Sequence, residues 1–180
     1  MKTSHLSDEK LVELVRTKDQ ELYAEVVRRY QDKLLRYATR ICGDEHLASD
    51  AVQQAFIKAF KNLNSFKTNK KFSSWLYRIA HNEAINLIKK ENKAFSISDW
   101  LAESLPATDK IETDTINKLE AERVSKCLSS LSLKYRSVLN LYYLEEKSYQ
   151  EISEILRLPT STVGVRLKRG KLKLQQICQK

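Results

Sequence analysis

The chain has 180 residues, 42% of them hydrophobic, and carries a formal net charge of +9. This hydrophobic content can build packed cores, so it excludes wholesale disorder, and the length allows one domain or two small ones. Gly occurs 3 times and Pro twice. Because sheets need frequent turn residues, whereas Leu, Lys, Glu and Ala favour helices, this composition predicts an all-α fold.

The excess of positive charge favours polyanionic partners, either nucleic acid or an anionic membrane surface. The apolar runs are far shorter than the ~20 residues that a membrane span needs. The N-terminal residues lead into charged side chains rather than into the apolar core of a secretory signal. We therefore expect no membrane insertion and a cytoplasmic location.

The cysteine and histidine spacings predict neither a metal site nor a disulfide framework. All six residues stand far apart in the sequence or lack further ligands nearby: Cys42, Cys127, Cys178, His5, His46 and His81. The sequence also has no phosphate-binding loop, nucleophile elbow or zinc-protease motif. We therefore expect no catalytic residue, no cofactor and no metal, and a reducing compartment.

Residues 1–90 carry a net charge of +6 and are predicted to form four helices. Ser7 is the predicted N-cap of the first helix. The second runs from about Gln20 to Ile41 and ends near Gly43, a natural C-cap. Apolar residues at helical spacing predict the third helix over residues 48–63 and the fourth over residues 72–90.

The fourth predicted helix has one buried face and one polar face. Leu76, Ala80, Ala84 and Leu87 form the inward stripe, and Trp75 is predicted to be a core aromatic. The polar face carries residues at steps of three or four: Arg78, Asn82, Asn86, Lys89 and Lys93. Cations can hold phosphates, and Asn offers a donor and an acceptor to a base edge. An ordinary solvated face is the alternative for both asparagines.

A cationic loop precedes this helix. Residues 67–71 contain three lysines, Lys67, Lys70 and Lys71, and follow Phe66 directly. Unpaired nucleic-acid bases bind through such combinations of cations and aromatic rings. The loop therefore predicts a single-stranded DNA or RNA contact.

Residues 91–117 carry a net charge of −4, contain Pro106, and show no sustained helical stripe. This segment predicts a flexible linker between two basic helical domains. A surface loop of one domain is the alternative, although about 25 residues is long for one. We expect a first domain over residues 1–93, a linker over 94–116 and a second domain over 117–180.

The second basic block, residues 118–180, has a net charge of +7 and ends in a predicted helix-turn-helix. Two helices precede it, one through residues 116–131 and one containing Val138, Leu139 and Tyr142. Ser148 and Glu151 have the spacing of a capping box. Residues 158–161 break that helix, and Thr160 or Ser161 is the expected cap of the next.

The last predicted helix places Val163, Leu167 and Leu174 inward. Its other side gathers a hydroxyl and cations: Thr162, Arg166, Lys168, Arg169, Lys171 and Lys173. A short capped helix, a tight turn and a basic helix fit the major groove of DNA, although a solvated basic face is the alternative. Gly164 and Gly170 each cost about 1 kcal/mol of helix propensity. Close approach of the backbone to DNA would account for both glycines.

Three motifs resemble the extracytoplasmic-function sigma factors of bacterial RNA polymerase. F-x-x-W-L-x-R-I-A-x-N over residues 72–82 is similar to the family's regions 2.3 and 2.4. Residues 50–56, D-A-V-Q-Q-A-F, are similar to D-x-x-Q-E-x-F of region 2.2. Residues 149–167 are similar to the helix-turn-helix of region 4. The resemblance covers about residues 7–93 and 117–175, in the family's order.

The resemblance implies a role for each of three groups of residues. The promoter −10 element would be contacted by Lys67, Lys70, Lys71, Arg78, Asn82, Asn86, Lys89 and Lys90, with Asn82 reading a base and the loop holding a flipped-out base. The −35 element would be contacted by Ser161, Thr162, Gly164, Val165, Arg166, Lys168, Arg169 and Lys173. Core polymerase would be bound by Asp50, Gln53, Gln54 and Ile57, and Phe56 would serve mainly as core.

The chain departs from the family pattern at several of these positions. Gln54 replaces the usual Glu, and Asn86 stands where Asp is common. Ser161, Gly164 and Val165 replace Gly, a basic residue and a hydroxyl residue in the helix that reads −35. The resemblance therefore implies the family role without implying a particular promoter sequence.

The resemblance also implies the partners: core RNA polymerase, double- and single-stranded promoter DNA, and a cognate anti-sigma factor. The main alternative is a DNA-binding regulator with one helix-turn-helix and an effector domain. Such a regulator has no need of an aromatic helix and a cationic loop for unpaired bases. An anti-sigma factor is a weaker alternative, because it would not need two basic domains.

Overall fold

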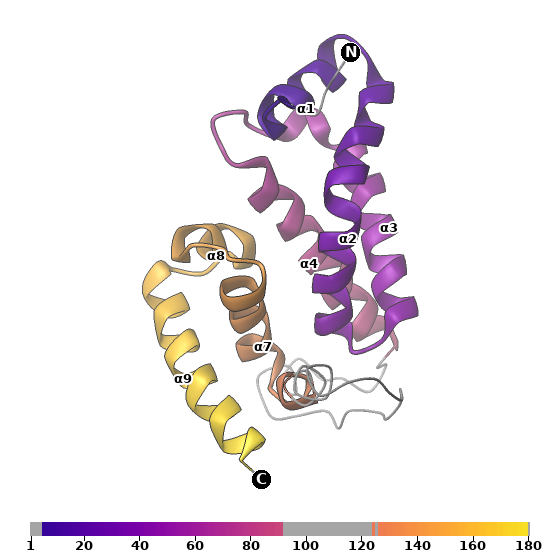
Figure 1. Ribbon diagram of the computed structural model, residues 1–180. Coiled ribbons are helices and arrows are strands. Elements are labelled where there is room, and N and C mark those ends of the chain that lie inside the picture. Colours follow the sequence, from indigo (N-terminus) through magenta and orange to yellow (C-terminus); the bar gives the residue numbers. More distant parts are fainter. Residues whose placement is uncertain (1–4, 92–123, 125, 180) are drawn as a thin grey trace. The chain divides into compact units, whose positions relative to one another are not determined.

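The computed structural model describes residues 5–91, 124 and 126–179. All regular elements within these residues are helices, so the all-α prediction is confirmed there (Figure 1). The chain divides into two compact units, and each is described by itself. The predicted linker over residues 94–116 lies outside the described residues.

The N-terminal unit contains the four predicted helices. They are α1 (Asp8–Thr17), α2 (Tyr23–Cys42), α3 (Glu45–Lys61) and α4 (Phe72–Glu91), with short 3₁₀ turns η2 (Gln20–Leu22) and η3 (Leu63–Ser65). Ser7 caps α1 by accepting a hydrogen bond from the Lys10 amide. Gly43 closes α2 at φ +74°, a left-handed conformation that glycine adopts without steric cost. The turn at Gly43 lets α2 and α3 pack side by side (Figure 1).

The core of this unit combines large side chains with alanines. Leu34 and Tyr37 on α2 are fully buried, as are the predicted stripe residues Leu76, Ala80 and Ala84 on α4. Alanines on α3 let the neighbouring helices approach closely: Ala48, Ala51, Ala55 and Ala59. Phe56 is also buried, as expected for a core residue.

The C-terminal unit carries α7 (Leu133–Leu139), η4 (Asn140–Leu144), α8 (Tyr149–Leu156) and α9 (Thr160–Cys178). The capping box is confirmed: the Ser148 amide donates to Glu151 at 3.0 Å, and the Glu151 amide donates to the Ser148 hydroxyl at 3.2 Å. The predicted cap of α9 is wrong. Pro159 occupies the N-cap without a side-chain hydrogen bond, and Thr160 is already helical.

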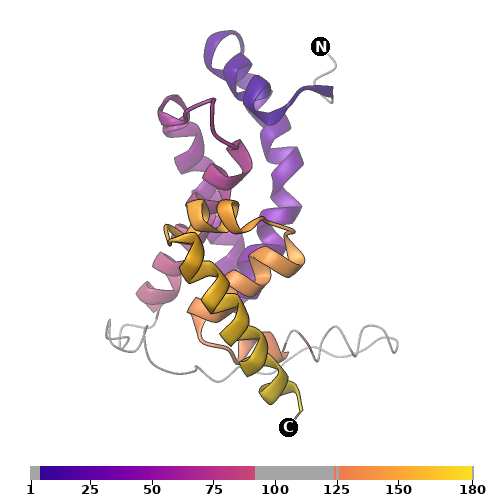
Figure 2. The same cartoon turned by 90° about the vertical axis from the view of Figure 1, so that its left-hand side faces the viewer.

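Helix α9 packs against α7 (Figure 2). Gly170 lies where the backbone of α9 comes close to α7 side chains. A Cβ at this position would lie 3.2 Å from Cδ1 of Leu139 and 3.4 Å from Cβ of Tyr135. The DNA-contact explanation for Gly170 is therefore wrong, because the glycine is buried against α7. Its cost in helix propensity is offset by close helix packing.

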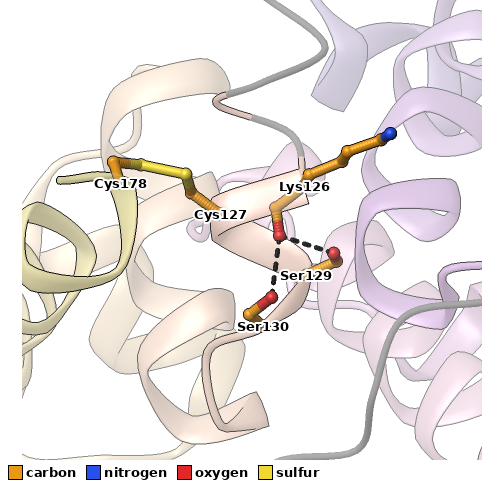
Figure 3. The surroundings of a disulfide bond; sticks show 5 residues. All are labelled: Lys126, Cys127, Ser129, Ser130 and Cys178. Carbon is orange, nitrogen blue, oxygen red and sulfur yellow. Dashed lines mark hydrogen bonds between the residues drawn. A yellow bond between two sulfur atoms is a disulfide. The ribbon is translucent and has the colours of Figure 1, made fainter. Parts of the chain in front are cut away.

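The prediction that no disulfide forms is also wrong. Cys127 and Cys178 are bonded to each other, with their Cα atoms 5.6 Å apart (Figure 3). The bond ties a helical segment before α7 to the last residue of α9. The two cysteines are separated by 51 residues, so only the packing of the unit brings them together. Cys42 is not part of a disulfide.

Among the residues that the structure describes, no helix is long and apolar enough to cross a bilayer. The same residues contain no cluster of three or more His, Cys, Asp or Glu side chains that could hold a metal ion.

Candidate nucleic-acid interface

Helix α4 presents its polar face away from the buried stripe. Asn82, Asn86, Lys89 and Lys90 are exposed, and Arg78 is partly exposed; Lys93 lies outside the described residues. Glu83 is the only acidic residue between positions 72 and 90. It is buried, and its carboxylate accepts a hydrogen bond from Lys58 on α3 at 2.7 Å. Because that acid is paired inside the unit, the polar face is cationic and open to a phosphate backbone.

His81, next to Asn82, has a structural role. Its Nδ1 lies 2.9 Å from the hydroxyl of Tyr37 on α2, and burial lowers the pKa of the imidazole to about 4. The ring is therefore neutral at pH 7 and fixes α4 against α2.

All five residues of the cationic loop, 67–71, are exposed, and the aromatic residues at both its ends are buried. The rings of Phe66 and Phe72 have centroids 5.3 Å apart. Trp75 is half-buried beside them, with ring centroids 5.5 Å from Phe66 and 5.7 Å from Phe72. The predicted core role of Trp75 is thus fulfilled only in part, since one part of its side chain reaches solvent.

Helix α3 has a second exposed face, which carries the residues expected to bind polymerase. Asp50, Gln53, Gln54 and Ile57 are all exposed, opposite the buried alanines. Phe60 extends this face, with 40% of its surface exposed. Its ring packs on that of Tyr23, with the two ring centroids 4.9 Å apart. Sequence reasoning missed Phe60, although its place one helical turn after Ile57 is the signal that could have revealed it.

In the C-terminal unit, α9 buries Val163 and Leu167 as predicted, while Leu174 is half-buried. Of the residues expected to contact −35 DNA, five are exposed and three are partly exposed. The exposed residues are Ser161, Val165, Lys168, Arg169 and Lys173, and the partly exposed residues are Thr162, Gly164 and Arg166. The exposed side of the helix therefore carries the cations Arg166, Lys168, Arg169 and Lys173, as a helix that enters a DNA groove would need.

A tyrosine cluster beside α9 was not foreseen from the sequence. The ring centroids of Tyr142 and Tyr143 are 4.9 Å apart, and those of Tyr142 and Tyr149 are 5.4 Å apart. All three side chains are exposed by more than a third. A Cβ at Gly164 would touch the Tyr149 ring at 3.4 Å, so this glycine lies against the cluster.

Two protein-family models match the chain: Sigma-70 region 2 over residues 26–94 and Sigma-70 region 4 over residues 121–174. The ECF RNA polymerase sigma factor SigW of Bacillus subtilis is 35% identical over 176 residues, covering 93% of this chain and 94% of that protein. The ECF RNA polymerase sigma-E factor of Escherichia coli K12 is 34% identical, covering 94% of this chain and 93% of that protein.

Two solved structures have a similar fold. One is CnrH in complex with the cytosolic domain of CnrY, with a TM-score of 0.73, 23% identity, and coverage of 96% of this chain and 97% of that chain. The other is the sigma factor RpoE of Bartonella quintana in complex with the anti-sigma factor NepR. Its TM-score is 0.72 at 21% identity, over 87% of this chain and 96% of that chain.

Proposed function

The chain belongs to the extracytoplasmic-function family of RNA polymerase sigma factors, and on this premise we propose a division of labour among its surfaces. As a sigma factor it binds core RNA polymerase and directs transcription initiation at promoters. We propose that it acts in the cytoplasm, where the polymerase works, as a transcription initiation factor rather than as an enzyme. The proposal concerns which residues perform each step.

Recognition of −10 DNA is assigned to α4 and the cationic loop. The observation that carries the proposal is the exposed polar face of Asn82, Asn86 and Lys89, with Glu83 paired inside the unit. Lysines hold the strand backbone while the Asn82 amide pairs with a base edge. The loop lysines and the half-exposed Trp75 provide the cations and the aromatic surface that an unpaired base requires.

Recognition of −35 DNA is assigned to α9, and polymerase binding to the exposed face of α3. On α9, Arg166, Lys168 and Arg169 lie in the half that a helix-turn-helix places in the major groove. On α3, the exposed Ile57 and Phe60 beside Asp50 and Gln53 combine an apolar centre with a polar edge, as protein interfaces do.

An anti-sigma factor is the second partner that we propose. Both similar structures hold a second protein, which in one of them is named an anti-sigma factor. For this chain, the exposed apolar residues of α3 and the tyrosine cluster beside α9 are the surfaces that such a regulator would cover.

The decisive experiment is reconstitution with purified core RNA polymerase. The chain should copurify with core enzyme and direct transcription from a subset of genomic promoter fragments. Binding of the free chain to specific duplex DNA, without retention by core enzyme and without initiation, would identify an ordinary DNA-binding regulator instead.

A further inference from the structure

Arg16 on α1 holds the first end of the cationic loop. Its guanidinium donates hydrogen bonds to the carbonyl oxygens of Leu63 and Phe66, the latter at 2.6 Å. The guanidinium carbon also lies 5.7 Å from the centroid of the Phe66 ring. A charged donor thus fixes the last backbone carbonyl before the loop, and hydrogen bonds to charged groups are among the strong ones.

Glu9, also on α1, holds the other end. Its Oε1 accepts a hydrogen bond from the backbone N–H of Phe72 at 3.0 Å. Phe72 is the first residue of α4, where backbone N–H groups have no partner within the helix. A carboxylate is favourable at that position, because it satisfies a donor and complements the helix dipole.

Helix α1 is itself fixed in the unit, so its two contacts can hold the ends of the loop at a fixed distance from each other. Asp8 accepts a hydrogen bond from Arg29 on α2 at 2.8 Å and another from the Tyr30 hydroxyl. The apolar face of α1 is buried through Leu11 and Val15. The hydrogen bonds of Glu9 and Arg16 to the loop ends therefore come from a helix that is itself fixed on α2.

Between the two braced ends lie five exposed residues, of which the amide of Lys70 bonds to the carbonyl of Lys67 at 2.9 Å. An exposed loop that must be ordered on binding loses conformational entropy, which weakens the interaction. Fixing its ends before binding reduces that cost and restricts which base the loop can accept.

We propose that Glu9 and Arg16 are positioning residues, which hold the two ends of the cationic loop and thereby set base selectivity at the position the loop contacts. This inference rests on the proposed −10 function of the loop. It adds two residues of α1, outside the three groups expected to bind DNA or polymerase.

The test uses holoenzyme, assembled from the full chain and core polymerase, and premelted promoter DNA with the −10 strand randomised. Bound DNA is sequenced to obtain the base preference at each position. The variants are Glu9→Ala, Arg16→Ala and Arg16→Lys. The controls are Glu13→Ala, which removes an exposed acid from the same helix, and Arg28→Ala, which removes an exposed arginine from α2.

We expect Glu9→Ala and Arg16→Ala each to reduce discrimination at one base position by about tenfold, the scale of one hydrogen bond to a charged group. Arg16→Lys should restore part of that discrimination, because the ammonium can still donate to one carbonyl. The preference that depends on Asn82, the affinity for core polymerase and the profiles of both controls should stay unchanged.

Three outcomes would overturn the inference. An unchanged base profile in both alanine variants would show that the braces do not set selectivity. An equal loss of discrimination at every base position, together with a lower melting temperature, would show that Glu9 and Arg16 act only by stabilising the fold. If Arg16→Ala does not fold, the base profile of Glu9→Ala alone decides between these outcomes.

The third outcome separates this inference from the function on which it rests. The double variant Lys70→Ala/Lys71→Ala changes the loop itself. If it leaves the base profile unchanged, the loop does not read a base, and both the loop assignment and the inference fall. If it changes the profile while the α1 variants do not, only the inference falls.

Discussion

The carboxylate of Glu83 on α4 lies 2.7 Å from the ammonium of Lys58 on α3. The Glu83 side chain is only 11% exposed, whereas that of Lys58 is 50% exposed. The pair therefore matters through the buried acid, which would be left without this partner if the lysine were lost. It also keeps the only acidic side chain of residues 72–90 away from the face of α4 that we propose to bind DNA.

Lys58→Ala should lower the free energy of unfolding of the N-terminal unit by about 1–3 kcal/mol, the cost of an unsatisfied buried group. Urea denaturation followed by circular dichroism measures this change. Lys61→Ala, which removes an exposed cation from the same helix, is the control and should have little effect. Equal stabilities for the two variants would show that water satisfies Glu83 without Lys58.

Asn82→Ala should impair promoter opening while sparing the other binding steps. Loss of a paired base-edge contact costs ~1–3 kcal/mol, roughly 5- to 150-fold in binding. We propose that core polymerase contacts α3 and that −35 DNA contacts the other unit, so binding of both should be retained. Permanganate reactivity of unpaired thymines on a cognate promoter reports the defect directly.

The matched control for this substitution is Asn64→Ala, since Asn64 is an exposed asparagine in η3. It should open the promoter as the unchanged chain does. Full melting by the Asn82 variant at equal concentration and salt would make Asn82 an ordinary surface residue.

The pH dependence of stability should reveal the half-buried His81. Burial lowers its pKa from 6.5 to about 4, so between these values the unfolded chain binds a proton that the folded chain does not. Stability should therefore be full above pH 6.5 and fall as the pH drops towards 4, by on the order of 1–3 kcal/mol. Urea titrations between pH 7 and 4.5 would measure the decline.

His81→Gln should flatten this pH profile, because glutamine does not titrate but can still bond to Tyr37. His46→Gln, at an exposed histidine on α3, should keep the original slope. A slope that survives His81→Gln would assign the pH dependence to other groups.

The sequence predicted the helices well because their signals are local. The capping box at Ser148 and Glu151 and the C-cap at Gly43 each involve residues only a few positions apart. The exposed faces of α3, α4 and α9 followed from helical spacing in the same way. The proposed partner of each surface came from the family resemblance, because helical spacing alone is also compatible with an ordinary solvated face.

The misses are contacts between distant segments. Cys127 and Cys178 are 51 residues apart, and nothing in their neighbourhoods marks them as a pair. Gly170 was assigned to DNA because the sequence does not show that α7 lies against it. Arg16 and Glu9 likewise contact residues about 50 to 63 positions away, which no periodicity can reveal.

The Cys127–Cys178 bond should stabilise the C-terminal unit under oxidising conditions. Closing a loop of this length removes chain entropy from the unfolded state worth about 4 kcal/mol. Dithiothreitol should therefore lower the melting temperature of the unit, and Cys127→Ser should lower it equally and abolish the response to dithiothreitol. Cys42→Ser is the control and should leave the response intact. An identical melting curve with and without reductant would show that the bond does not form in solution.

The basic residues of α9 should divide into those that read bases and those that hold phosphates. Lys168 and Arg169 are exposed in the middle of the helix, while Lys173 lies a turn later, with its ammonium 5.9 Å from the Tyr135 ring centroid. Lys173→Ala should weaken binding of holoenzyme to all duplex sequences alike and reduce the salt slope by ~1. Lys168→Ala/Arg169→Ala should instead change the preferred −35 sequence.

Selection from a duplex library randomised over the −35 element, repeated at several salt concentrations, measures both quantities at once. Lys33→Ala, on α2 of the other unit, controls for a general loss of positive charge and should change neither. Because a phosphate contact carries no sequence information, the Lys173 variant should return the same preference profile as the unchanged chain. If the double variant also returned that profile, Lys168 and Arg169 would contact only DNA phosphates and would have no part in the choice of promoter.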